Sequence, residues 1–174
     1  LINHQSGLPD YLNDTKTRTV LVNKLSKVPS MLEKLVVGKP IARDVAVKHV
    51  IEVMLELPST LFTPGNDTSY SNTGYLLLAD ILEKTSGLSF IRLANAKIFE
   101  PLAMKSTQLM NMEAIEIPWS ATGYDVIDSS INKYRRNSTN IITQGEGGLL
   151  TTLADFSKWI SHLIKPKEEK LFWN

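Results

Sequence analysis

The chain reads FTPGNDTSYSNTGYLLLADIL from residue 62 to residue 82, and this stretch decides the fold. It opens with a Pro-Gly turn pair, passes through polar residues, and ends in a leucine-rich run that leads to Ser86-Gly87. This order predicts a loop, then a helix over residues 72–85, then a glycine stop. Tyr70 and Asn72 stand where the loop meets the helix, a place from which polar side chains can point into one cleft.

Apolar periodicity predicts further helices on both sides of this stretch. Residues 15–27 have near-helical apolar spacing. Residues 42–57 form the clearest predicted helix, which Pro58 stops. Ser89 can cap another helix that runs toward Phe99. The apolar stripe of the 42–57 helix, which we assign to the core, consists of Val47, Val50, Ile51, Met54 and Leu55.

The pattern changes after residue 107. Between residues 108 and 143 the apolar residues lie in short, polar-flanked runs, which predict short strands or extended loops. Residues 128–140 are polar and basic, and we interpret them as a solvated loop in preference to a cleft rim that attracts carboxylates. Thr152, followed three residues later by Asp155, is a capping-box variant and predicts a final helix.

Composition limits the class of protein. The chain has 174 residues, of which 43% are hydrophobic, enough for one domain with its own core. Lys plus Arg number 19 and Asp plus Glu 18, with no basic stripe, so we expect no nucleic-acid partner. There is no Cys, and the three His residues have no metal-ligand spacing, so the sequence predicts neither a disulfide nor a metal site.

Four motifs carry a resemblance to a known family. They occur in the order Ser6-Gly7-Leu8-Pro9, Tyr70-Ser71-Asn72, Pro101-Leu102-Ala103-Met104 and Gly145-Glu146-Gly147-Gly148-Leu149. In this order they resemble the serine β-lactamase and penicillin-binding-protein superfamily, in particular its class C branch. The third motif departs from the family pattern, which has Gly where this chain has Ala103.

The resemblance implies a mainly α (α+β) fold, the helical subdomain of the β-lactamase-like fold with a few short strands. Residues 1–174 would then be a single, incomplete domain whose flanking α/β segments are absent. It also implies a serine hydrolase that acts by acyl transfer on amide, lactam or ester bonds of a small-molecule or peptide-like substrate, outside the cytoplasm and without a cofactor. Tyr70 would share proton transfer with the family's lysine, and Asn72 would hydrogen-bond both substrate and lysine.

The family's nucleophile is the serine of Ser-x-x-Lys, which precedes Tyr-x-Asn, and a Lys/His-x-Gly triad follows. In this sequence the only Ser-x-x-Lys is Ser130 to Lys133, in the wrong order, and Lys84-Thr85-Ser86 mimics the triad at a predicted helix end. Ser71 is the remaining candidate nucleophile, but a space-filling role is favoured for it. His4 is interpreted as a structural hydrogen-bonding residue.

We therefore expect the isolated chain to be inactive. Two alternatives stay open: a non-catalytic relative that keeps the scaffold, or a helical binding module. The faces that would meet absent segments also predict self-association, through the helices that contain residues 76–82 and 156–163.

Overall fold

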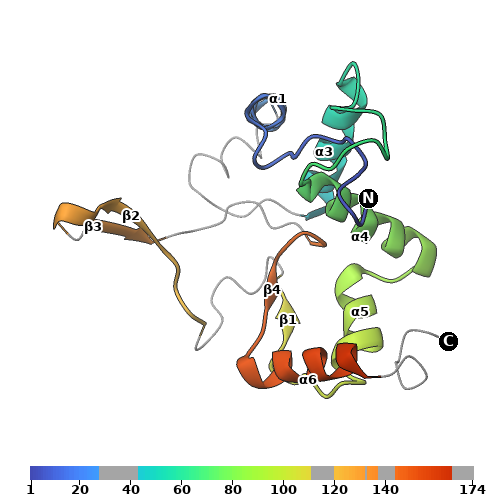
Figure 1. Ribbon diagram of the computed structural model, residues 1–174, viewed down its shortest axis with the longest axis vertical. Coiled ribbons are helices and arrows are strands. Elements are labelled where there is room, and N and C mark those ends of the chain that lie inside the picture. The colour runs from blue at the N-terminus through green and yellow to red at the C-terminus, as the bar shows by residue number, and fades with distance from the viewer. Residues whose placement is uncertain (28–42, 111–119, 132, 137–143, 166–174) are drawn as a thin grey trace.

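The computed structural model describes residues 1–27, 43–110, 120–131, 133–136 and 144–165. The described helices are α1 (Thr15–Ser26), α3 (Arg43–Glu56), α4 (Asn72–Ser86), α5 (Phe90–Ala94), the π-helical turn η1 (Asn95–Phe99), the 3-10 turn η2 (Ser129–Ile131) and α6 (Leu153–Ile164) (Figure 1). The strands are β1 (Gln108–Leu109), β2 (Tyr124–Asp128), β3 (Lys133–Arg136) and β4 (Leu149–Leu150). This arrangement confirms the mainly helical α+β fold that the sequence predicts.

The predicted caps explain where the helices begin and end. Gly87 ends α4 in the left-handed conformation (φ 69°), and its N–H donates to Glu83 O. The Ser89 side chain caps α5, and the Thr152 side chain caps α6. The helix predicted from Ser89 to Phe99 is only partly regular. After Ala94 it widens into η1, in which the Glu100 N–H bonds Asn95 O at 3.0 Å, the i to i−5 pairing of a π turn.

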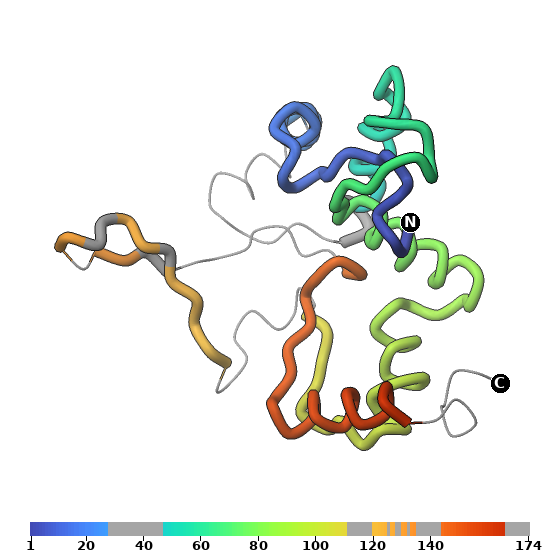
Figure 2. The backbone as a smooth tube through the Cα atoms, viewed as in Figure 1, coloured from blue at the N-terminus to red at the C-terminus, as the bar shows by residue number. Residues whose placement is uncertain are grey.

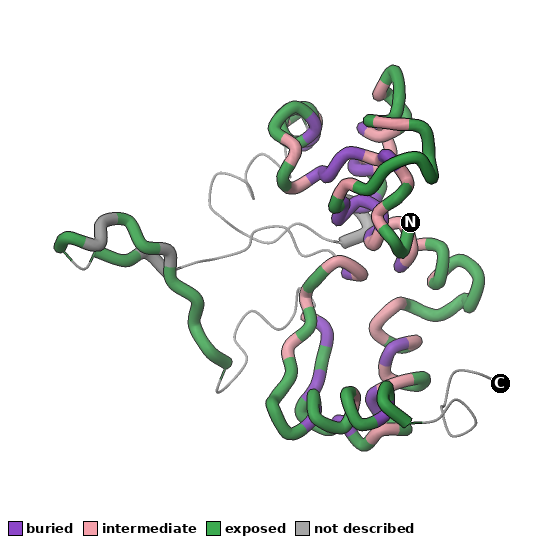
Figure 3. Tube along the Cα trace, viewed as in Figure 1, coloured by how far each residue is buried: buried purple, intermediate pink, exposed green. Residues whose placement is uncertain are grey.

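The first core lies between α1, α3 and α4. Buried residues of these helices and of the loop before α1 form this core. The described residues of the β2–β3 hairpin, in contrast, are exposed (Figure 3). At the solvent-exposed edge of this core, Lys24 of α1 pairs with Glu52 and Glu56 of α3. The core consists of Tyr11, Leu21, Leu25, Val47, Val50, Val53 and Leu76.

The predicted stripe of α3 needs one correction. Val47 and Val50 are buried as predicted, and Ile51 and Met54 pack partly buried against the core, but Leu55 is 80% exposed and Val53 is fully buried in its place. Leu55 lies five residues after Val50, roughly 140° round a helix, whereas Val53 lies only about 60° away. The buried face is therefore centred on Val50, where α3 meets α1 and α4.

A second, smaller core joins α5, η1 and α6. Phe99, Met104 and Leu109 are buried there, and Trp159 of α6 packs against them. Strand β1 pairs antiparallel with β4, with Leu109 opposite Leu149, and this short sheet links the end of η1 to the start of α6. The Met110 N–H extends the link by donating to Gly148 O at 2.7 Å.

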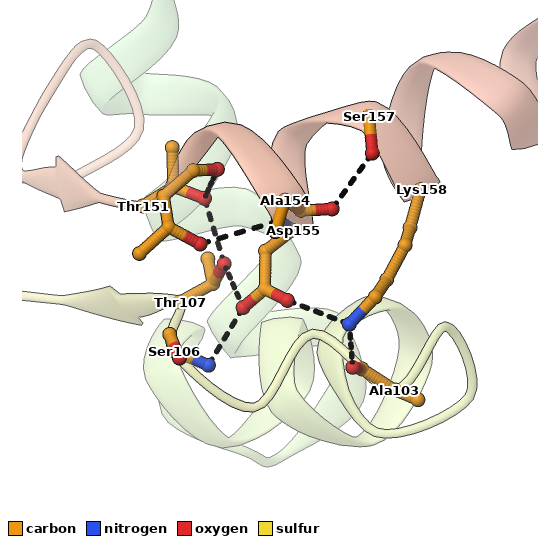
Figure 4. Close-up of polar contacts among 9 residues, drawn as sticks. Ala103, Ser106, Thr107, Thr151, Ala154, Asp155, Ser157 and Lys158 are labelled. Atoms are coloured by element: carbon orange, nitrogen blue, oxygen red, sulfur yellow. Dashed lines mark hydrogen bonds and ion pairs between the residues drawn. The ribbon is translucent and has the colours of Figure 1, made fainter.

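Asp155 fastens α6 to the turn that precedes β1 (Figure 4). Its Oδ2 accepts the Ser106 N–H at 2.6 Å and the Thr107 hydroxyl at 3.1 Å, and its Oδ1 accepts Lys158 Nζ at 2.7 Å. The hydrogen bond from the Lys158 ammonium, together with those from Ser106 and Thr107, holds the pKa of Asp155 below its ordinary value despite burial. Thr152 caps α6 by accepting the Asp155 N–H at 3.3 Å, as the predicted capping box requires, but the Asp155 carboxylate makes these tertiary contacts.

The β2–β3 hairpin projects away from the helices (Figure 1). Tyr124 lies opposite Arg136 and Val126 opposite Tyr134 in antiparallel register. The interpretation of residues 128–140 as a loop is therefore wrong for Asp128, which ends β2, and for residues 133–136, because antiparallel pairing satisfies their backbone groups. Residues 132 and 137–140 of that segment, and the predicted apolar runs around Ile115 and Ile141, lie outside the described residues.

Candidate active site

The start of α4 brings Tyr70 and Asn72 together. Ser71 is the N-cap: its backbone is extended (φ −148°, ψ 110°), and its Oγ accepts the Gly74 N–H at 3.3 Å. Tyr70 lies just outside the helix and Asn72 is its first residue, and Tyr70 Oη donates a hydrogen bond to Asn72 Oδ1 at 3.0 Å. The two predicted site residues therefore touch, while their catalytic roles stay predictions.

Burial separates the three residues of this motif. Tyr70 is 61% exposed, whereas Asn72 is 7% and Ser71 only 1% exposed. The Ser71 hydroxyl faces the interior and is engaged by the helix cap, which fits the structural role favoured for it. The Tyr70 side chain is therefore open to solvent, and its hydroxyl is bonded to the buried Asn72.

Asp10 lies on the other side of Asn72. Its Oδ2 accepts Asn72 Nδ2 at 2.8 Å, and the Asn72 backbone N–H approaches the same oxygen at 3.4 Å. Thr73 anchors the same segment, because its hydroxyl donates to Pro9 O at 2.7 Å and accepts the Tyr11 N–H at 3.0 Å. The Pro9-Asp10-Tyr11 segment is thus fixed across the first turn of α4.

His4 lies against the exposed tyrosine. Its ring centroid is 4.7 Å from that of Tyr70 and 5.2 Å from that of Tyr75. Its Nδ1 accepts the Ser71 N–H at 3.2 Å, which places the ring proton on Nε2. The geometry is that of the structural hydrogen-bonding residue predicted from the sequence, and it also positions the Tyr70 ring.

The N-terminal segment reaches this site by lying along residues 60–70 (Figure 2). The Leu61 N–H donates to Gly7 O at 2.8 Å, the Gly65 N–H to Gln5 O at 2.9 Å, and the Ser69 N–H to His4 O at 3.0 Å. Gly7 is required there, because its φ is +69° and a Cβ would lie 2.4 Å from Phe62 O. The Ser-Gly-Leu-Pro motif thus delivers His4 and Asp10 to the start of α4.

The loop of residues 144–148 packs against α4 at Tyr75 and Ala79. Gly145 has φ +112°, and a Cβ there would lie 2.5 Å from Tyr75 O. The Tyr11 hydroxyl donates to Glu146 Oε1, while the buried Glu146 Oε2 has no hydrogen-bond partner among the residues that the structure describes. The glycine-rich motif is therefore a loop that packs closely on α4.

The two segments that match family motifs in the wrong place, Ser130 to Lys133 and Lys84-Thr85-Ser86, do not adjoin Tyr70. Ser130 belongs to η2, at the tip of the projecting β2–β3 hairpin (Figure 1). Lys84 is in the last turn of α4, where it pairs with Asp80 at 2.7 Å, roughly 20 Å along the helix from Tyr70. Within the described residues neither Tyr70 nor Asn72 bonds a lysine, and no group of three or more metal-ligating side chains gathers.

Sequence reasoning missed two polar neighbours of the site, Asp10 and Glu146. Asp10 is 62 residues away from Asn72 in the chain, and Glu146 is 135 residues away from Tyr11. The only local signal for Asp10 was its place after Pro9 in a turn, and Glu146 gave no signal beyond being a charge within a glycine-rich loop.

Comparisons with known proteins agree with the motif order. The model of the Beta-lactamase family matches residues 1–172. Among curated proteins, a D-aminopeptidase from Brucella anthropi is 30% identical over 118 residues, which are 68% of this chain and 22% of that protein. Penicillin-binding protein 4* from Bacillus subtilis is 37% identical over 116 residues, 64% of this chain and 20% of that protein. The chain therefore spans about a fifth of these relatives.

Solved structures show the same fold. The octameric penicillin-binding protein homologue from Pyrococcus abyssi matches 97% of this chain with a TM-score of 0.66 and 23% identity, over 34% of its own length. The D-amino acid amidase from Ochrobactrum anthropi matches 92% of this chain with a TM-score of 0.64 and 20% identity, over 42% of its own length. Family match, relatives and fold agree, and the chain belongs to the β-lactamase family.

Proposed function

We propose that this chain is part of a serine hydrolase that cleaves amide bonds by acyl transfer. The observation that carries the proposal is the Tyr70 to Asn72 hydrogen bond at the start of α4, in a chain of the β-lactamase family. The names of similar proteins, a D-aminopeptidase and a D-amino acid amidase, favour an amide over a lactam or an ester. We extend this to the substrate: a small peptide or amide with a D-residue on the acyl side.

In the proposed reaction the serine and lysine come from the Ser-x-x-Lys motif of the family. The serine oxygen attacks the amide carbon, the C–N bond breaks, and the amine leaves with a proton. A serine hydroxyl is a weak nucleophile unless a base removes its proton. In this proposal Tyr70 relays that proton to the leaving amine, and water then hydrolyses the acyl-enzyme.

Asn72 contributes by holding the phenol. Its Oδ1 accepts the Tyr70 hydroxyl, and the second lone pair of that oxygen is available to a lysine ammonium or a substrate N–H. A free tyrosine has a pKa near ~10, so a nearby cation is what makes its phenolate accessible at neutral pH. The proposal therefore needs the lysine as much as the serine.

The test is a substrate panel for the natural full-length protein: D- and L-alanine p-nitroanilide, a chromogenic cephalosporin and a nitrophenyl ester, with acylation followed by mass. We expect the D-anilide to be cleaved fastest. A protein that binds such compounds without acylation is the non-catalytic relative, and the proposal then fails.

The isolated 174-residue chain gives a second test. We expect no covalent adduct with any of these compounds, because neither Ser71 nor Ser130 has the surroundings that acyl transfer needs. An adduct on Ser71 or Ser130 would overturn the rejection of that serine as a nucleophile.

A further inference from the structure

Asp10 is a buried carboxylate that accepts hydrogen bonds from amide N–H groups of Leu12, Asn13 and Asn72. It is 6% exposed and precedes α1 by a few residues. Its Oδ1 accepts the Leu12 N–H at 2.8 Å and the Asn13 N–H at 3.2 Å. Its Oδ2 accepts Asn13 Nδ2 and Asn72 Nδ2, each at 2.8 Å, and it faces the first turn of α4, where negative charge is favourable.

These contacts determine how the Asn72 amide is oriented. The oxygen and nitrogen of an asparagine side chain have nearly the same shape, so only hydrogen bonding distinguishes the two orientations. An ionised carboxylate accepts and never donates, so the NH₂ group of Asn72 must face Asp10. The amide oxygen must then face Tyr70, whose hydroxyl donates to it.

We propose that Asp10 is a positioning residue that fixes the Asn72 amide so that its oxygen, not its nitrogen, faces the active site. The catalytic consequence rests on the proposed function; the orientation itself does not. When the amide oxygen faces Tyr70, Asn72 can accept a hydrogen bond from Tyr70 and one from a second donor at the same time. With the nitrogen facing Tyr70, Asn72 could only donate to the phenol oxygen, and it could no longer accept from the Tyr70 hydroxyl, a lysine ammonium or a substrate N–H.

The sharpest variant is Asp10→Asn. An asparagine at position 10 keeps an oxygen for the Leu12 and Asn13 N–H groups, so the local turn survives. Its NH₂ group, however, would face the NH₂ of Asn72, and that donor-to-donor contact favours a flipped Asn72. Asn72→Asp creates the opposite mismatch, because the carboxylates at positions 10 and 72 would then face each other in a buried site.

Combining Asp10→Asn with Asn72→Asp restores one donor and one acceptor across the contact. We expect each single variant to lower the melting temperature of the 174-residue chain by on the order of 5 °C, and the double variant to recover at least half of the summed loss. Asp14→Asn is the matched control. Asp14 caps α1 by accepting the Thr17 N–H at 2.8 Å, and asparagine caps equally well, so little change is expected. Additive losses in the double variant would overturn the proposal.

Two further readouts decide the question if a single variant does not fold. In the unaltered chain, NMR exchange should show one protected side-chain proton on Asn72; two freely exchanging protons would overturn the orientation. In the natural full-length protein, Asp10→Asn should lower kcat about tenfold or more on the D-anilide with KM nearly unchanged, and the double variant should regain part of kcat. If the unaltered protein cleaves no amide, the proposed function fails, and the stability cycle still tests Asp10.

Discussion

At the scale of single residues, Ala103 adopts a backbone conformation that suits glycine. Its φ is +51°, in the left-handed region, where a Cβ costs roughly 1–2 kcal/mol. Family resemblance places a glycine here, in the Pro-Leu-Gly-Met turn. The turn persists with alanine because the neighbouring hydrogen bonds hold it, including the one from the Met104 N–H to Phe99 O at 2.8 Å.

Ala103→Gly should therefore stabilise the chain by about 0.5–1 kcal/mol, which raises the melting temperature by about 1–4 °C. Ala94→Gly is the control of opposite sign, because Ala94 has helical angles (φ −61°, ψ −43°) and a buried methyl group. Thermal unfolding followed by circular dichroism measures both. A loss of stability in Ala103→Gly would mean that the alanine methyl contributes more packing than its backbone costs.

At the scale of elements, the contacts of Asp155 make the stability of α6 docking depend on pH. Its pKa is lowered first by the Lys158 hydrogen bond. A carboxyl group whose folded pKa lies below its unfolded value of about 3.9 contributes stability above that value, and the contribution is lost as pH falls through the folded pKa. Asp155→Asn should therefore lower the melting temperature at pH 7, with a gap that narrows toward pH 3.

Melting temperatures between pH 7 and pH 3 measure this gap. Ser157→Ala, on the same helix, replaces a group that does not titrate and should leave the pH dependence of the unaltered chain intact. The difference in melting temperature between the Asp155→Asn variant and the unaltered chain could instead stay constant with pH. That result would show that the charge of the Asp155 carboxylate does not stabilise the docking of α6.

Elements also show what the sequence can and cannot predict. Caps are local, so Gly87, Ser89 and Thr152 were predictable from neighbours within four residues. Pairings between distant segments were not: Leu109 lies opposite Leu149, and Asp10 binds Asn72, and a single sequence has no pattern that links such positions. The position of Tyr70 beside Asn72 was predictable because both belong to one short motif, whereas the residues that hold them were not.

At the scale of the whole molecule, α6 presents an apolar stripe to solvent. The sequence predicted this face, and in the described structure much of it is uncovered. The stripe consists of Leu153 (86% exposed), Phe156 (44%), Ile160 (41%), Leu163 (44%) and Ile164 (78%). Monomeric proteins rarely expose apolar patches of more than a few hundred Å².

None of the described helices has the length and apolar content needed to span a bilayer.

We expect a second copy of the chain to cover this stripe. Sedimentation velocity across a dilution series should show concentration-dependent association, and Phe156→Glu combined with Ile160→Glu should reduce it. Val126→Glu combined with Ile127→Glu is the matched control, because these β2 side chains are exposed to a similar degree on the hairpin. A compact monomer at every concentration would contradict the expectation.

The central claim is that Tyr70 works in acyl transfer and not merely in folding. The most direct measurement is the acylation rate of the natural full-length protein carrying Tyr70→Phe, which removes only the hydroxyl that Asn72 accepts. General acid–base groups contribute about 10²–10⁴-fold, so we predict a loss of at least about 100-fold with the melting temperature nearly unchanged. Tyr75→Phe, which removes the hydroxyl bonded to Ile2 O at 3.0 Å, should keep the rate within a few-fold. A Tyr70→Phe protein that acylates at the unaltered rate would contradict the account.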